Sequence, residues 1–189
     1  MATLEPALMR SLLQPYDASL PEDVLGSLSI YLDLLVRWNA KTNLTAIRDP
    51  QEMVRRHFGE SLFLARHLPE CTTLLDLGSG AGFPGLPVQL VLPSLRVTLA
   101  ESQNKKATFL REVVRTLGLK TEVWASRVET MPVDRRFDVV ALRAVDQPEL
   151  ALELARAHLA PGGVIAHLTS GEGGIAVPGS TSAVLRLVR

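Results

Sequence analysis

The spacing of apolar residues changes near residue 72 of this 189-residue chain. Before that point apolar side chains recur every three or four residues, a spacing typical of amphipathic helices. After it, short apolar runs alternate with helical stretches, which predicts parallel strands joined by crossover helices. We therefore expect an α/β fold, with a mostly parallel sheet flanked by helices over residues 72–189. A helical cap over residues 1–71 is expected to pack on this core.

Local signals place the individual elements. Helices are expected over residues 22–39 and 50–67. Asp49 is placed to cap the second helix, with Pro50 at its first position and Glu52 completing a capping box. Strands are expected over residues 73–77, 96–100, 121–125, 137–142, 164–168 and 183–188. The intervening helices are expected around residues 88–91 and over residues 104–117 and 149–159.

Charge and cysteine content exclude several classes of protein. The chain has 20 basic and 20 acidic residues, which excludes a polycationic tail protein but not a local basic patch. Cys71 is its one cysteine, so intrachain disulfides and four-cysteine zinc sites are excluded, and no metal centre is expected. The first residues lack a signal-peptide pattern, and no apolar run reaches the length of about 18 residues that a membrane span needs. We therefore expect a cytoplasmic protein.

A glycine-rich segment directly follows the first expected strand, with the sequence DLGSGAGFPG over residues 76–85. Ligands of open α/β sheets bind beyond the carboxyl ends of the strands, and glycines let the backbone approach a ligand closely. Glu101 ends the second expected strand, where its carboxylate can accept hydrogen bonds from ribose hydroxyls. Two ligands fit, S-adenosylmethionine and a dinucleotide. Asp76 favours the methyl donor, because it is placed to orient the loop and the amino-acid end of that donor. Pro84 and Pro87 count against a dinucleotide, because they spoil the helix entry that cradles a pyrophosphate.

Two more strand ends carry candidate site residues. SRVE over residues 126–129 follows the third expected strand, where an adenine ring commonly lies in this fold; Val128 offers an apolar face and Glu129 an acceptor. Arg143 follows the fourth strand. It either pairs with the nearby Asp146 or takes part in the site.

The sequence narrows the reaction only partly. Methyltransferases of adenine amino groups use an Asn/Asp-Pro-Pro-aromatic stretch after the fourth strand, where this chain has LRAVD. Enzymes that methylate pyrimidine carbons need a nucleophilic cysteine, but Cys71 precedes the first strand, at the wrong end of the sheet. A target with its own lone pair, such as guanine N7, needs neither device, only alignment with the donor. Small-molecule and protein targets stay open.

Basic residues gather in two segments. Residues 36–66 hold six basic against three acidic residues, and residues 105–127 hold six against two. Each is either an ordinary solvated helix face or a surface that contacts phosphates. His57 lies in the first segment and is either a structural histidine or part of the site.

Taken together, several stretches resemble the bacterial RsmG (GidB) family, S-adenosylmethionine-dependent methyltransferases that modify a guanine at N7 in small-subunit ribosomal RNA. The matching stretches are WNAKTNLTAIR (residues 38–48), RH (56–57), DLGSGAGFPG (76–85), KK and FL (105–106 and 109–110), SRVE (126–129) and RA (143–144). NLT within the first stretch is the specific part, since the glycine loop would fit many methyltransferases.

The resemblance implies a Rossmann-like class I methyltransferase fold and a set of site residues. The expected donor-binding residues are Gly78, Gly80, Gly82, Phe83, Glu101, Val128, Glu129 and Arg143; of these, the glycines at 80 and 82 are inferred from the loop itself. Asn43, His57 and Arg143 are expected to be catalytic by positioning the target base, and Arg48, Lys105 and Lys106 to bind RNA. The expected partner is 16S ribosomal RNA or the small ribosomal subunit, bound by a monomer.

One departure and three alternatives accompany this interpretation. Family members continue after the fifth strand through another helix and a long strand pair, whereas this chain has a short glycine-rich end over residues 171–189. This leaves open how the far edge of the sheet closes. The alternatives are a methyltransferase of another RNA or a small molecule, a dinucleotide-dependent oxidoreductase, and a non-catalytic RNA-binding module. The intact glycine loop and Glu101 disfavour the last.

Overall fold

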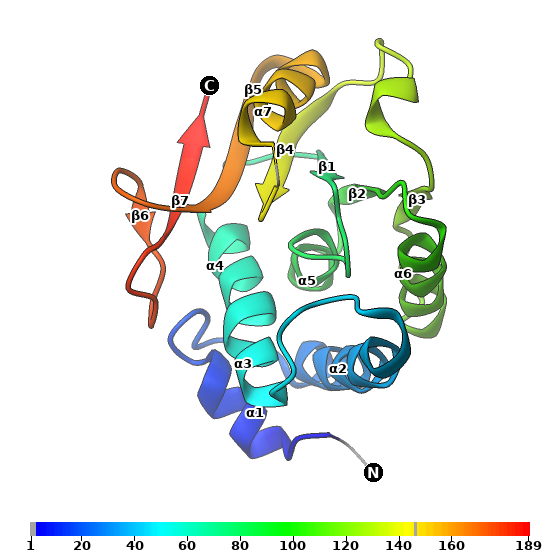
Figure 1. Ribbon diagram of the computed structural model, residues 1–189. Coiled ribbons are helices and arrows are strands. Elements are labelled where there is room, and N and C mark those ends of the chain that lie inside the picture. The colour runs from blue at the N-terminus through cyan, green and yellow to red at the C-terminus, as the bar shows by residue number, and fades with distance from the viewer. Residues whose placement is uncertain (1–2, 146) are drawn as a thin grey trace.

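The computed structural model describes residues 3–145 and 147–189, and its centre is a seven-stranded sheet with helices on both faces (Figure 1). The strands are β1 (Thr73–Leu77), β2 (Arg96–Ala100), β3 (Glu122–Trp124), β4 (Phe137–Arg143), β5 (Leu159–Ser170), β6 (Ile175–Ala176) and β7 (Ala183–Val188). They lie in the order β3-β2-β1-β4-β5-β7-β6, with β1 to β5 parallel and the last two antiparallel. The expected mostly parallel sheet is confirmed.

The strand order reverses at β1. From β1 the chain moves outward through β2 and β3, and then returns to place β4 on the other side of β1. Crossovers on opposite sides of one strand leave a crevice at its carboxyl end, which is where open α/β sheets bind ligands. The glycine-rich segment begins at this point of the sheet.

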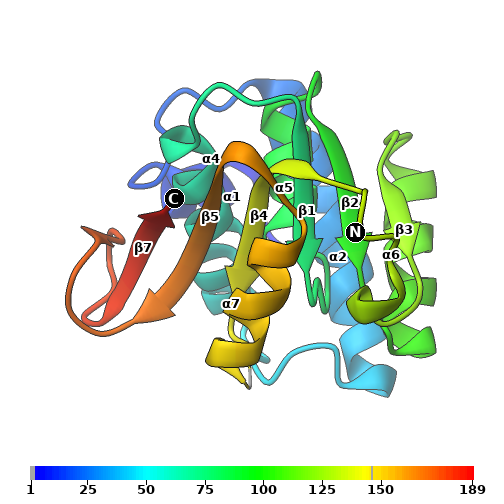
Figure 2. The ribbon, with the colours of Figure 1, turned by 90° about the horizontal axis from the view of Figure 1, so that it is seen from above.

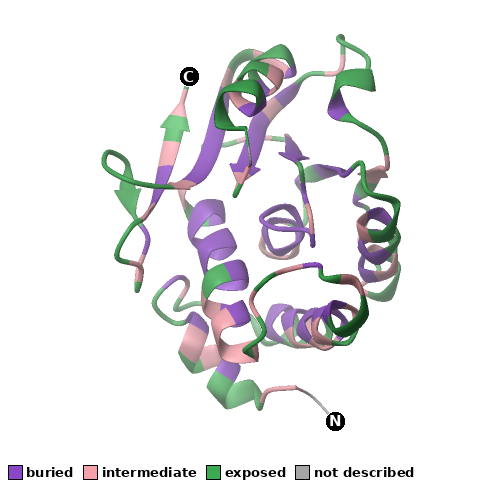
Figure 3. Ribbon diagram, viewed as in Figure 1, coloured by how far each residue is buried: buried purple, intermediate pink, exposed green. Residues whose placement is uncertain are grey.

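The helices cover the two faces unequally (Figure 2). On one face lie α2 (Glu22–Thr42), α4 (Glu60–His67), α5 (Gly85–Val91) and α6 (Asn104–Thr116), which share a hydrophobic core with strand residues such as Leu74 and Leu99. The other face carries α7 (Pro148–Ala157) and the 3-10 turn η2 (Val128–Thr130), which pack on Leu75 and Leu142. Figure 3 shows α5 buried at the centre of the first face.

The N-terminal helices pack directly against the sheet layer. Leu28 and Tyr31 of α2 belong to the same buried cluster as Leu99 of β2 and Phe109 of α6. Helix α1 (Pro6–Leu13) packs in turn on α2. The division of the chain into a cap and a core at residue 72 stays a prediction.

The helix expected over residues 50–67 is interrupted. It consists of α3 (Pro50–Met53), a π-helical segment η1 (Val54–Gly59) and α4. The Asp49 carboxylate accepts a hydrogen bond from the Glu52 amide at 2.9 Å, which confirms the predicted N-cap. The expected return bond from the Glu52 side chain is not formed among the described residues, since that carboxylate faces Arg55 and Arg56 instead. π-Helical segments concentrate at functional sites, and η1 carries His57.

The far edge of the sheet is closed by a hairpin. Strand β5 begins at Leu159, earlier than expected, and β7 pairs with it antiparallel. The two-residue β6, which the sequence did not predict, then covers part of β7. Arg186 holds the glycine-rich turn before β6 by donating to the Gly173 carbonyl at 2.9 Å. Across the described residues, no helix has the length and apolar character to cross a membrane.

Candidate functional site

The glycine loop leaves β1 in a left-handed conformation. Gly78, Gly80 and Gly82 have φ angles of 73°, 58° and 92°, which side chains other than glycine rarely adopt. A Cβ added at Gly78 would meet nothing within 4 Å, whereas one at Gly82 would lie 2.5 Å from both Leu86 and the Tyr31 hydroxyl. Gly78 therefore keeps a cavity open, while Gly82 permits close packing beneath the loop.

Asp76 ties the loop to β1 from below. Its side chain is buried, and one carboxylate oxygen accepts a hydrogen bond from the Gly85 amide at 2.9 Å. A Cβ added at Gly85 would lie 2.7 Å from that same oxygen, so glycine is required there. Burial raises the pKa of Asp76 to about 7, although the Gly85 hydrogen bond opposes the shift. The sequence pointed to this residue as the one that orients the loop.

Glu101 is fixed by two backbone amides. One carboxylate oxygen accepts from Gly80 at 3.0 Å and the other from Gln103 at 2.7 Å, and the side chain is buried. Each oxygen keeps a second lone pair for a ligand hydroxyl. The carboxylate is thus held at the carboxyl end of β2 before any ligand arrives.

Two adjoining cavities open at this edge of the sheet. The first, called the strand-end cavity, has a volume of about 440 Å³. Its lining includes Glu101, Val128, Glu129 and Ala151. The second, called the loop-side cavity, has a volume of about 410 Å³ and lies between the glycine loop and the N-terminal helices. The two share Gly78, Glu101 and Val145 in their linings, so one extended ligand can occupy both.

The structure brings most of the expected site residues to these cavities. Residues that line the loop-side cavity include His57, Gly80, Phe83, Lys106 and Arg143. Asn43, Arg48, Gly82 and Lys105 do not line either cavity. Leu44 and Thr45 also line the loop-side cavity. They belong to the NLT stretch that carries the family resemblance, but no site role was expected for either of them.

A hydrogen-bonded loop presents Leu44 and Thr45 to that cavity. Asn43 ends α2 with a φ of 48°, and its side-chain oxygen accepts from Arg48 at 2.6 Å. Beneath it the buried Asn39 accepts from the Thr45 amide at 2.9 Å and donates to the Ile47 carbonyl at 3.2 Å. The conspicuous NLT stretch is therefore a loop whose polar residues mainly fix its shape.

Phe83 is stacked between Tyr31 and His57. Its ring lies 5.2 Å from that of Tyr31 at an interplanar angle of 7°, and 4.8 Å from that of His57 at 20°. The Tyr31 hydroxyl donates to the Ala81 carbonyl. This stack connects α2, the glycine loop and η1, and it fixes the position of the imidazole.

His57 is buried and uncharged at neutral pH. Its Nε2 lies 2.8 Å from the Thr45 hydroxyl, while Nδ1 has no hydrogen-bond partner among the described residues. Desolvation, reinforced by the positive charges of Arg143 and Arg56, lowers the pKa of His57 to about 3. The imidazole therefore offers neutral hydrogen-bonding groups and not a cation.

The shifted pKa values of His57 and Asp76 predict opposite dependences of the folding stability on pH. His57 has a native pKa of about 3, below its unfolded value of about 6.5, so its contribution is lost as pH falls below 6.5. Asp76 has a native pKa of about 7, above its unfolded value of about 3.9, so its contribution is lost as pH rises from 4 to 7. Each slope is expected to be about 1.4 kcal/mol per pH unit.

Urea unfolding of the wild type, His57→Gln and Asp76→Asn between pH 4 and 7.5 measures both slopes. The stability difference between the wild type and His57→Gln should shrink as pH falls, while that between the wild type and Asp76→Asn should shrink as pH rises. Two pH-independent differences would contradict the native pKa values given above.

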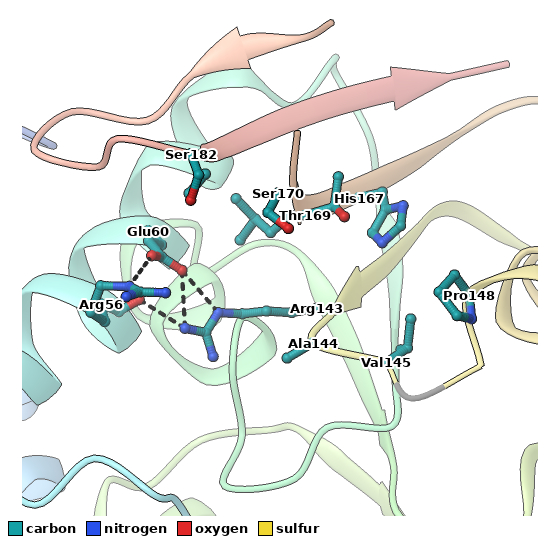
Figure 4. Close-up of a pocket in the computed structure, with 12 residues that line it drawn as sticks. Arg56, Glu60, Arg143, Ala144, Val145, Pro148, His167, Thr169, Ser170 and Ser182 are labelled. Carbon is teal, nitrogen blue, oxygen red and sulfur yellow. Dashed lines mark hydrogen bonds and ion pairs between the residues drawn. The ribbon is translucent and has the colours of Figure 1, made fainter. Parts of the chain in front are cut away.

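Arg143 pairs with a buried acid that the sequence did not indicate. Its Nε and Nη2 donate to one carboxylate oxygen of Glu60 at 3.2 and 3.0 Å, and Arg56 Nε donates to the other at 2.7 Å (Figure 4). Asp146, the alternative partner, lies outside the described residues. The spacing of four residues between Arg56 and Glu60 in the expected helix was the available sequence signal for Glu60.

Comparison with known protein families agrees with this geometry. The family model described as rRNA small subunit methyltransferase G, GidB, matches residues 25–172. The chain belongs to this family. A family protein of Stenotrophomonas maltophilia is 45% identical over 165 residues, which cover 87% of this chain and 74% of that protein. A family protein of Chromobacterium violaceum is 41% identical over 162 residues, which cover 85% of this chain and 78% of that protein. The predicted GidB membership is confirmed.

Solved structures with low sequence identity share the fold. Coclaurine N-methyltransferase, bound to N-methylheliamine and SAH, matches with a TM-score of 0.54 at 17% identity, over 85% of this chain and 50% of that one. An O-methyltransferase family protein from Burkholderia thailandensis matches with a TM-score of 0.53 at 16% identity, over 79% of this chain and 54% of that one. This GidB family chain therefore spans about half the length of each, and the expected Rossmann-like methyltransferase fold is confirmed.

Proposed function

We propose that the protein transfers a methyl group from S-adenosylmethionine to N7 of a guanine in 16S ribosomal RNA. The observation that carries this proposal is the pair of joined cavities around Gly78, at the switch point of the sheet, in a member of the GidB family. We place the reaction in the cytoplasm and assign it to a monomer.

The residues present fit the methyl donor. Val128 and Glu129 in the strand-end cavity are suited to an adenine ring, and the fixed carboxylate of Glu101 to ribose hydroxyls. The open space above Gly78 admits the remainder of the molecule, which a side chain at this position would displace. When bound, S-adenosylmethionine supplies an electrophilic methyl group on a sulfonium.

The loop-side cavity would hold the target base. Guanine N7 carries its own lone pair, so the nitrogen–carbon bond forms as the sulfur–carbon bond breaks and no proton has to be removed. The protein's task is therefore alignment. The uncharged His57 and the clamped Arg143 are both fixed in place for this purpose. We assign Asn43 to the rim, because it is exposed beside Leu44 of the cavity lining.

Phosphates of the RNA would meet basic residues around the rim. Arg48 and Lys105 are exposed, and Lys106 lines the loop-side cavity. Because the net charge of the chain is zero, affinity for arbitrary RNA should be weak and sensitive to salt. Specificity is then left to the local shape of the RNA around the target and to a few contacts.

Methyl-labelled S-adenosylmethionine tests the proposal directly. The protein is incubated with small ribosomal subunits and with deproteinised 16S RNA from a strain that lacks this methyltransferase. Label should appear in the RNA and be recovered as 7-methylguanine. Calorimetry with S-adenosylhomocysteine and with NAD checks the cofactor. Donor binding without label in RNA would refute the substrate, and NAD binding without any response to S-adenosylhomocysteine would favour the oxidoreductase alternative.

A further inference from the structure

A third cavity lies on the far side of Arg143 from the glycine loop. It has a volume of about 350 Å³ and lies among η1, the ends of β4 and β5, and the start of β7. Its lining shares Arg143, Ala144 and Val145 with the loop-side cavity, so these residues form a common wall. No residue of the glycine loop lines it, and among the described residues it shares Val145 alone with the strand-end cavity.

Four polar side chains face this cavity, and within the part of the chain that the structure describes their polar atoms have no protein partner. Figure 4 shows His167, Thr169, Ser170 and Ser182 in a row opposite Arg143. Among the described residues, none of the three hydroxyls and neither ring nitrogen of His167 forms a hydrogen bond, although every one of these residues lines the cavity. Such a row can donate to the oxygens of a ligand that reaches it.

The charged residues of the lining favour an anion. Arg56 and Arg143 are both present, and the one acid of the described lining, Glu60, already accepts hydrogen bonds from both. Arg56 remains about half exposed, with a side-chain exposure of 49%. Burial and the charge of Arg186 lower the pKa of His167, so its imidazole is neutral at pH 7 and adds no cation.

We propose that this cavity holds the ribose-phosphate of the nucleotide next to the target guanine. The inference rests on the proposed function, since a base in the loop-side cavity brings its own backbone to the wall at residues 143–145. Serine, threonine and arginine side chains are common partners of RNA and DNA phosphates, and sequence-specific RNA recognition usually targets unpaired nucleotides. Thr169 and Ser182 are the positioning residues for this neighbour.

The double variant Thr169→Val/Ser182→Ala tests the inference. It removes two hydroxyls with little change in shape, and each lost hydrogen bond should weaken binding by roughly 3- to 10-fold. We expect the KM for 16S RNA to rise by about 10-fold or more, while kcat at saturating RNA and the affinity for S-adenosylhomocysteine stay within 2-fold of the wild type. Thr116→Val/Ser94→Ala is the matched control. Both of its residues are exposed, and neither lies in a cavity shared with Arg143.

A chemically altered RNA identifies the contacted group. The guanine that the wild type methylates is first mapped. Short RNAs are then made with a neutral methylphosphonate linkage on one side of that guanine or the other. One linkage should raise the KM of the wild type by a larger factor than that of the double variant, because the two changes share the hydroxyl contacts while the attraction to Arg56 is lost in both proteins. An unchanged KM in the double variant, weakened S-adenosylhomocysteine binding, or full additivity with both linkages would overturn the inference. Absence of methylation by the wild type would instead refute the proposed function.

Discussion

Gly78→Leu should reduce the affinity for S-adenosylhomocysteine by roughly 100-fold or more, as measured by calorimetry. The Cβ of residue 78 points into open space shared by the strand-end and loop-side cavities, so the leucine side chain would fill the volume proposed for the donor. Affinity for 16S RNA should largely persist, because the expected phosphate-binding residues lie elsewhere on the rim.

Gly118→Leu separates this effect from backbone strain. Gly118 follows α6 with a φ of 63°, close to the 73° of Gly78, and a Cβ there also meets nothing within 4 Å. Both variants should lose about 1–2 kcal/mol of folding stability from the left-handed conformation, but only the change at residue 78 should affect ligand binding. Equal ligand affinity in the two variants would mean that the donor lies elsewhere.

Glu60→Ala should destabilise the protein by about 3–5 kcal/mol, as measured by urea unfolding, because it leaves the largely buried Arg143 without its carboxylate partner. The side-chain exposures are 5% for Glu60 and 13% for Arg143, so water from the adjoining cavities can replace the lost carboxylate only in part. The same variant should lower kcat, since the guanidinium between the loop-side cavity and the third cavity would no longer be held in place.

Two further variants make this prediction specific. Glu122→Ala removes a more exposed carboxylate, which Arg135 contacts at 2.6 Å, and it should cost about 0–1 kcal/mol. Glu60→Gln keeps hydrogen-bond acceptance without the charge and should fall between the two alanine variants in stability. If Glu60→Ala and Glu122→Ala lowered stability equally, the buried ion pair would not be important for the fold.

The carboxyl edge of the parallel sheet could be predicted as the donor-binding edge from the sequence, and the reason is physical. Strand positions follow from short apolar runs, and parallel strands end at one edge of the sheet, so residues just after different strands converge. Gly78, Glu101 and Val128 are far apart in the chain, yet all three line the strand-end cavity. Their roles in binding the donor stay predictions.

The π-helical segment and β6 were missed because neither has a local signature. One extra residue in a helical turn changes the apolar spacing over residues 50–67 so little that the sequence pattern does not reveal the π-helical segment. A strand of two residues, Ile175–Ala176, is too short to show alternation. Both form because of what they pack against: η1 contacts α1 and α4, and β6 pairs with β7.

By itself, the sequence determined the class of fold, the glycine loop at the switch point and the family to which the chain belongs. The expected elements and the glycine loop depend on spacing and turn chemistry that act between residues a few positions apart, and the family follows from short stretches spread over residues 38–144. Only the tertiary structure decided that Glu60 clamps Arg143, 83 positions away, and that Phe83 stacks between Tyr31 and His57. Such contacts depend on how distant segments cross, and periodicity carries no information about that.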